Sequence, residues 1–156
     1  MSSNDVHVWL ATLDSPANCE NQIAKSLTEA ERLKSERFHF KRDRKHFIVG
    51  RGILRIILAR YLDIEPNLVQ FSYGPHGKPY LAERLGDGAL RFNLAHSHEL
   101  SIYAFTRARQ IGVDIEYLRS IPDTEQIAAD FFSARENAVL QALPTNQRQS
   151  AFFTCW

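Results

Sequence analysis

The sequence has 156 residues and a mass of 17.9 kDa, enough for one ordinary domain or two small lobes that share an interface. Apolar residues make up 44% and charged residues 24%, which excludes wholesale disorder, and the net charge of +1 does not by itself indicate a nucleic-acid binder. No apolar run approaches the roughly eighteen residues of a membrane span, and the N-terminus lacks a signal peptide. The two cysteines, Cys19 and Cys155, have no metal-type or redox-type spacing. We therefore expect a cytoplasmic protein without disulfides and without a membrane partner.

The charge is distributed unevenly along the chain. Residues 32–60 contain ten basic and two acidic residues, a net +8, whereas the remainder carries nine basic and sixteen acidic residues, a net −7. This excess of positive charge predicts a region that holds an anion. The alternative is a solvated helical face.

The first half of the chain predicts a strand followed by two helices. Residues 6–12 are apolar and β-branched enough for a strand, and Thr28 with Glu31 has the spacing of a capping box at a helix start. A longer helix is predicted over Asp43–Leu62. Two rows run along this helix, one apolar (Phe47, Gly50, Leu54, Ile57, Leu58, Tyr61) and one basic (Arg44, Arg51, Arg55).

Short strands separated by turns are predicted next, over 68–73, 90–95, 100–106 and 110–116, with turn residues at 74–77 and 86–88. The last two strands are expected to pair through the polar link 107–109. Helices then return, with Asp123 and Ser133 as candidate N-caps and a final helix that starts at Pro144-Thr145. Helices before and after a mostly antiparallel sheet predict an α+β fold.

The sharpest local motif is Gly112-Val113-Asp114-Ile115-Glu116. On a strand, both carboxylates project from one side about 6.6 Å apart, where they repel by about 2.5 kcal/mol at an effective dielectric near 20. A divalent cation turns this repulsion into attraction, and Mg²⁺ is commonly held by one or two carboxylates beside substrate phosphates. Taken alone, the motif is more typical of the solvated face of an amphipathic strand than of a metal site.

Three further motifs have both a functional and a structural interpretation. His96 and His98 in Phe-Asn-Leu-Ala-His-Ser-His could be metal ligands, phosphate donors or a general base, although a histidine near a strand end is more often structural. Gly77-Lys78-Pro79 could form a stiff phosphate-binding loop or an ordinary turn. Glu136 follows Ser133 at capping-box spacing, so we assign it to structure.

Taken in order, the basic helix, Gly-Lys-Pro, Asn-x-x-His-Ser, Gly-Val-Asp-Ile-Glu and Phe-Phe-Ser-x-x-Glu resemble the 4′-phosphopantetheinyl transferase superfamily, specifically its larger Sfp-like type. The resemblance runs along nearly the whole chain. It implies two pseudo-symmetric α+β lobes with coenzyme A, as co-substrate, and Mg²⁺ bound between them. The implied reaction moves the phosphopantetheine arm onto a serine of an acyl or peptidyl carrier protein and releases adenosine 3′,5′-bisphosphate. A complete protein of this type is expected to be a monomer.

The resemblance also implies roles for particular residues. Asp114 and Glu116 match the metal ligands and are the catalytic residues. His96 matches a histidine that contacts a coenzyme A phosphate, and Lys78 with Pro79 matches the loop beside the adenine and 3′-phosphate. Basic residues that approach the phosphates correspond to Lys34, Arg37 and Lys41.

The sequence departs from the family pattern in three places. Ala95 replaces a usual serine, and His46 replaces a common arginine, so the phosphate clamp could instead use Arg51. The family pattern then continues through Trp-x-x-Lys-Glu, whose glutamate is a further metal ligand, whereas this sequence stops at Trp156. We therefore expect residues 1–109 to form the N-terminal lobe and 110–156 to begin an incomplete C-terminal lobe. Such a chain is expected to be inactive in transfer on its own.

Two other function classes remain as alternatives. One is a truncated fragment that binds coenzyme A or carrier protein without turnover. The other is a nucleic-acid-binding module built on residues 32–60, which is disfavoured because no recognised nucleic-acid motif accompanies the positive charge.

Overall fold

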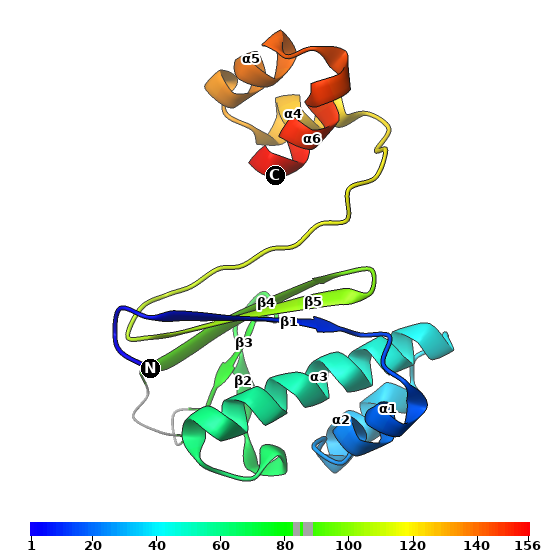
Figure 1. Cartoon of the computed structure of the whole chain (residues 1–156), viewed down its shortest axis with the longest axis vertical. Helices are drawn as coiled ribbons and strands as arrows, with labels where there is room; N and C mark the ends of the chain where they lie inside the picture. The colour runs from blue at the N-terminus through cyan, green and yellow to red at the C-terminus, as the bar shows by residue number, and fades with distance from the viewer. Residues whose placement is uncertain (83–84, 86–88) are drawn as a thin grey trace. The chain divides into compact units, whose positions relative to one another are not determined.

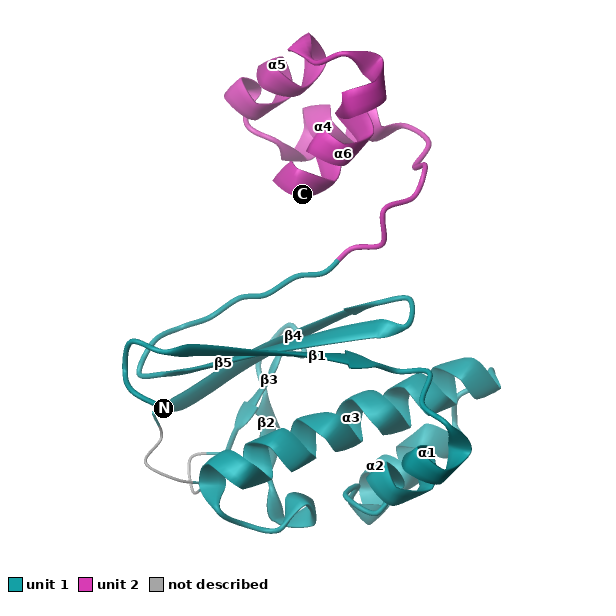
Figure 2. Ribbon diagram, viewed as in Figure 1, with its two compact units in different colours: residues 1–115 teal, residues 116–156 magenta. Residues whose placement is uncertain are grey.

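The computed structural model describes residues 1–82, 85 and 89–156 and divides into two compact units, Met1–Ile115 and Glu116–Trp156 (Figure 1, Figure 2). Its mixture of helices and antiparallel strands confirms the α+β class. The predicted lobe boundary between residues 109 and 110 concerns the whole protein and stays a prediction. The turn predicted at 86–88 lies outside the described residues.

Unit 1 contains a three-stranded antiparallel sheet in the order β1-β5-β4, built from β1 (Val6–Thr12), β4 (Leu90–Ser97) and β5 (Leu100–Arg107). Phe105 of β5 lies opposite His7 of β1 and Phe92 of β4. A second antiparallel pair joins β2 (Phe71–Tyr73) to β3 (Pro79–Leu81). β2 is shorter than the predicted strand because Leu68 ends a 3₁₀ turn, η1 (Pro66–Leu68), and residues 69–70 belong to no regular element.

The strand predicted over Gln110–Glu116 is wrong: residues 110–121 form no regular element. The predicted pairing fails because β5 already has β1 on one side and β4 on the other. The Val113 amide instead donates to the side-chain oxygen of Asn93, at 2.8 Å. The expected alternation in exposure does hold, since Val113 is half-buried and Asp114 is exposed.

Three helices precede β2, namely α1 (Ala17–Ala24), α2 (Glu29–Glu36) and α3 (Lys41–Leu62). The capping box at the start of α2 is confirmed, with Thr28 and Glu31 exchanging hydrogen bonds. α3 begins two residues before the predicted Asp43 and ends where predicted, followed by Asp63 in the left-handed conformation. α1 was not predicted; it follows Pro16 and has no side-chain cap.

The core of unit 1 lies between α3 and one face of the three-stranded sheet. Leu54, Ile57 and Leu58 of α3 are buried against aromatic residues of β4 and β5, which confirms the predicted apolar row for these residues. The predicted basic row runs from solvent into the core: Arg44 is exposed, whereas the side chain of Arg55 is only 3% exposed. Its guanidinium reaches Glu31 and the carbonyl oxygens of Pro66 and Val69, so it joins α3 to α2 and η1.

Unit 2 is a small cluster of α4 (Thr124–Phe131), α5 (Ala134–Ala142) and α6 (Thr145–Cys155) around buried Ala128, Leu140 and Phe152. The predicted capping box of Ser133 and Glu136 is confirmed, and it explains the lowered pKa of the Glu136 carboxyl through hydrogen bonds with Ser133. Asp123 precedes α4 as expected but makes no side-chain capping bond. Among the described residues, no helix combines the length and apolar character needed to cross a membrane.

Candidate functional site: a cavity with basic walls

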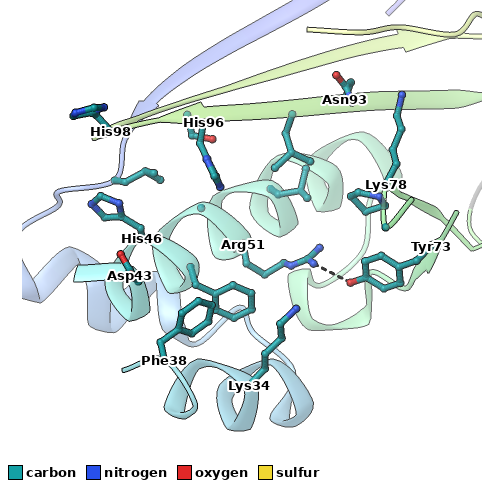
Figure 3. Close-up of a pocket in the computed structure, with 18 of the residues that line it drawn as sticks. Lys34, Phe38, Asp43, His46, Arg51, Tyr73, Lys78, Asn93, His96 and His98 are labelled. Atoms are coloured by element: carbon teal, nitrogen blue, oxygen red, sulfur yellow. Dashed lines mark hydrogen bonds between the residues drawn. The ribbon is translucent and has the colours of Figure 1, made fainter. Parts of the chain in front are cut away.

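A cavity of about 820 Å³ opens in unit 1 beside the N-terminal half of α3 (Figure 3). Its walls come mainly from α2, α3, the β2–β3 turn, and β4 with its following turn, with single residues from β5 and from the loops after β1 and α2. Eight of its lining residues are basic or imidazole side chains, Lys34, Arg42, His46, Arg51, His76, Lys78, His96 and His98, and Asp43 is the one carboxylate among the described lining residues. This charge distribution suits an anionic ligand.

Strand geometry places His96 in this cavity. Alternate residues of a strand share one face, so Phe92, Leu94 and His96 of β4 point to the same side. Phe92 is buried in the core and Leu94 packs against it, whereas His96 lies near the strand end and is exposed to the cavity. The apolar residues of β4 therefore orient this imidazole.

Gly77 and Lys78 occupy the turn between β2 and β3. Gly77 has a φ of +75°, a conformation that L-residues rarely adopt, and its amide donates to the Gly74 carbonyl at 2.9 Å. The Lys78 ammonium lies 3.3 Å from the carbonyl oxygen of Ile111, so it joins the turn to the segment after β5. An ammonium has three N–H donors, and this contact leaves capacity for a ligand.

His46 projects from α3 and contacts the loop after β1. Its Nε2 lies 3.1 Å from Oδ1 of Asp14, and the Lys45 ammonium lies 3.6 Å from the same oxygen. These contacts, led by the hydrogen bond from His46, lower the pKa of the Asp14 carboxyl. An ionised carboxylate accepts but cannot donate, so the contact requires a proton on Nε2 of His46.

Arg51 lies deeper in the wall, between α2 and β2. Its Nε is 3.4 Å from Glu31, and its Nη2 donates to the Tyr73 hydroxyl at 2.8 Å (Figure 3). Its guanidinium carbon is 4.6 Å from the ring centre of Phe71. Burial raises the pKa of Glu31, but hydrogen bonds from Arg55 and Thr28 and the charges of Arg55 and Arg51 outweigh it, so the net shift is downward.

The structure brings six of the predicted ligand-binding residues together in the cavity wall: Lys34, His46, Arg51, Lys78, Pro79 and His96. Arg37, the C-cap residue of α2, and Lys41, the first residue of α3, are exposed and lie outside the lining set. The ligand roles of all eight residues stay predictions.

Four polar lining residues were not predicted as site residues, Arg42, Tyr73, His76 and Ser101, whereas Asn93 belongs to the Asn-x-x-His-Ser motif. Arg42 belongs to the basic segment and His76 to the Gly-Pro-His-Gly-Lys-Pro turn, so composition and turn chemistry were available signals. Tyr73 carried none, because its position depends on how β2 packs beside α3.

Asp114 and Glu116 are both exposed, and neither lines the cavity. No described residue forms an ion pair with either carboxylate, so their oxygens remain available. Across the described part of the chain, no group of three or more His, Cys, Asp or Glu residues is gathered to hold a metal ion. Two free carboxylates nevertheless fit Mg²⁺, which usually takes one or two from protein and fills its shell with water and phosphate.

Comparison with known proteins identifies the family. The model of the N-terminal part of 4′-phosphopantetheinyl transferase matches residues 15–107, more than half of the chain. The 4′-phosphopantetheinyl transferase HetI of Nostoc sp. is 44% identical over 99% of this chain, and Sfp of Bacillus subtilis is 31% identical over 88%. This chain spans 65% of the first relative and 59% of the second. The chain belongs to the 4′-phosphopantetheinyl transferase superfamily, Sfp-like type.

Proposed function

We propose that this chain supplies the coenzyme A site of an Mg²⁺-dependent enzyme that transfers the 4′-phosphopantetheine arm of coenzyme A to a serine of an acyl or peptidyl carrier protein. The observation that carries the proposal is the cavity of about 820 Å³. Its lining contains eight basic or imidazole side chains and, among the described residues, a single carboxylate. Membership of the family supplies the reaction class.

The chemistry of coenzyme A matches this wall. Its pyrophosphate and 3′-phosphate carry several negative charges, and charge-assisted hydrogen bonds to such oxygens are about twice as strong as neutral ones. His96, Lys78 and Lys34 approach the cavity from three different elements, so they can contact phosphates on different sides. Pro79 continues the Lys78 turn and would stiffen the loop beside the adenine. Arg37 and Lys41 would add positive potential from outside the lining set.

Asp114 and Glu116 would hold the Mg²⁺ ion. When bound, the ion would supply charge stabilisation at the pyrophosphate and at the leaving phosphate. The two carboxylates contribute by being exposed and by having no described ion-pair partner, so a cation does not have to displace an existing contact. The basic cavity residues hold and orient the anionic co-substrate.

The partners and location follow from the same proposal. An acyl or peptidyl carrier protein would present the acceptor serine, the complete protein would be a monomer, and the reaction would take place in the cytoplasm. A fragment that binds coenzyme A or carrier protein without turnover is the alternative, and a nucleic-acid module is the less favoured one.

Calorimetry with coenzyme A and a mixed-sequence oligonucleotide tests binding, and mass spectrometry of an apo carrier protein tests transfer. We expect coenzyme A to bind more tightly than the oligonucleotide at physiological salt.

For transfer, Asp114→Ala in the full-length protein should abolish loading, while Glu65→Ala, which removes another exposed carboxylate, should load at the parent rate. Equal loading by Asp114→Ala and the parent would contradict the metal assignment. Tight coenzyme A binding without any loading by the full-length protein would favour the non-catalytic alternative.

A further inference from the structure

The segment that leads to Asp114 belongs to no regular element, so neither a strand ladder nor a helix fixes its backbone. It contains Gly112, and glycine has more backbone freedom than any other residue. Ile111 and Val113 are half-buried, whereas Gly112 and Asp114 are exposed. The conformation of the backbone before Asp114 therefore depends on individual contacts with the rest of unit 1.

Two side chains from other elements make such contacts. The side-chain oxygen of Asn93 accepts a hydrogen bond from the Val113 amide at 2.8 Å, and the Lys78 ammonium donates to the Ile111 carbonyl oxygen at 3.3 Å. Figure 3 shows the Lys78 side chain extending from the β2–β3 turn toward β4, the strand that carries Asn93. The two contacts lie on either side of Gly112, so they restrict the most flexible residue of the segment from both directions.

Asn93 is an unusual residue for its position. It lies in the middle of β4, opposite Ala104 of β5, although asparagine is depleted in strands. Its side chain is half-buried and bonds to an amide 20 residues further along the chain. That amide belongs to the residue immediately before Asp114. Because the Val113 carbonyl and the Asp114 amide share one planar peptide unit, holding Val113 also restricts the orientation of the Asp114 backbone.

We propose that Asn93 is a positioning residue for the metal site: by accepting from the Val113 amide, it keeps the backbone before Asp114 in one conformation for a divalent cation. The inference rests on the proposed function, because it requires Asp114 to be a metal ligand. The physical reason is entropic. A segment that is already ordered loses little conformational freedom when its carboxylate binds an ion. The same bond joins the strand that carries His96 to the segment that carries the metal ligand.

Hydrogen exchange of the Val113 amide, followed by NMR on this chain, measures the contact directly. In Asn93→Ala the amide should exchange about 10-fold faster than in the parent, because its acceptor is lost. Asn93→Asp keeps an acceptor oxygen and should keep the protection. Asn67→Ala is the matched control, because Asn67 is an exposed amide in η1. It should leave the exchange of Val113 unchanged.

Titration of the full-length protein with Mn²⁺ alone, followed by the electron paramagnetic resonance signal of the free ion, measures the consequence. Mn²⁺ is suitable because it favours carboxylate and water oxygens, as Mg²⁺ does. Asn93→Ala should weaken Mn²⁺ binding by about 3- to 10-fold, the loss expected for one hydrogen bond. Asn67→Ala should bind Mn²⁺ like the parent, and Asn93→Asp should bind it at least as tightly. If Asn93→Ala fails to fold, Asn93→Val replaces it, because valine suits a strand and lacks an acceptor.

The outcomes separate the positioning role from the proposed function. A purely structural Asn93 would lower the urea midpoint when replaced but would leave the Mn²⁺ affinity of the folded protein unchanged, and that result would overturn the positioning role alone. Asn93→Asp binding as weakly as Asn93→Ala, or fast exchange of Val113 in the parent, would also overturn it. A full-length parent that does not bind Mn²⁺ would refute both the metal assignment and the role of Asn93.

Discussion

Gly52 allows α1 to pack directly against α3, and its replacement by alanine should destabilise unit 1. A Cβ at this position would overlap the Cγ2 methyl of Ile23 and lie 2.9 Å from both the Ile23 carbonyl oxygen and the Ser26 hydroxyl. The carbonyl belongs to the backbone of α1, so it cannot retreat without moving that helix. Gly50 offers a matched control two residues away, since its Cβ would meet Leu13 at 3.4 Å and the Tyr103 hydroxyl at 3.7 Å.

The two substitutions should have opposite effects. Alanine in a helix interior is favoured over glycine by about 1 kcal/mol, and Gly50→Ala should realise part of that gain. Gly52→Ala receives the same propensity gain but incurs overpacking that typically costs about 1–3 kcal/mol, and more where backbone must shift. We expect the Gly52→Ala protein to be about 2 kcal/mol less stable than the Gly50→Ala protein.

Urea unfolding followed by Trp9 fluorescence measures this difference. Replacing Trp156 by phenylalanine in every variant confines the signal to unit 1, because the sequence has two tryptophans. With a urea slope of about 1–3 kcal/mol per molar, a 2 kcal/mol difference separates the midpoints by roughly 0.7–2 M. Equal midpoints, or a higher midpoint for Gly52→Ala, would refute the close packing of α1 on α3.

Three further predictions concern the cavity and its support. His96→Ala should weaken coenzyme A binding by about 1.5–3 kcal/mol in calorimetry while leaving dephospho-coenzyme A nearly unaffected; equal losses would place His96 elsewhere on the ligand. Because the pKa of Glu31 is lowered in the folded protein, Glu31 stabilises the fold at pH values above its unfolded-state pKa, and this stabilisation is lost as the pH falls through the folded-state pKa. Glu31→Gln should therefore flatten the acid limb of a plot of unfolding free energy, measured with urea, against pH. An unchanged acid limb would count against the ion pairs. Burial raises the pKa of Tyr103 to about 12, so stability present below pH 10 should decline between pH 10 and 12. Tyr103→Phe should lose that alkaline decline along with the bond to the Gly50 carbonyl, and an identical decline in both proteins would exclude Tyr103 as its source.

The local sequence pattern was sufficient to predict secondary structure wherever a segment's structure depends on its own residues. The capping boxes at Thr28 and Ser133 form as predicted because their hydrogen bonds span three residues. The strand at 6–12 was likewise predicted from its apolar and β-branched residues, and the end of α3 at Leu62 from helical period. The family could also be identified from the sequence, because the order and spacing of short motifs do not depend on packing.

Sequence pattern was misleading where a residue's role depends on partners far along the chain. The segment 110–116 alternates like a strand, yet β1 and β4 occupy both sides of β5, and they begin at residues 6 and 90. Arg55 was predicted to belong to a basic row, either an anion-binding face or a solvated one, but it is buried, and three acceptors brought together by the packing of α2 and η1 compensate its burial.

The cavity likewise combines features that the sequence predicts with features that depend on packing. Positive charge in residues 32–60 and the two histidines at the end of β4 and in its following turn were visible in the sequence, and they indicated an anion site. The neighbours of each cation were not visible: Glu31 is 20 residues before Arg51, and Tyr73 is 22 residues after it. Whether a basic side chain is neutralised by a carboxylate or left available for a ligand depends on distances of a few ångströms. Only the packing of α2, α3 and β2 determines those distances.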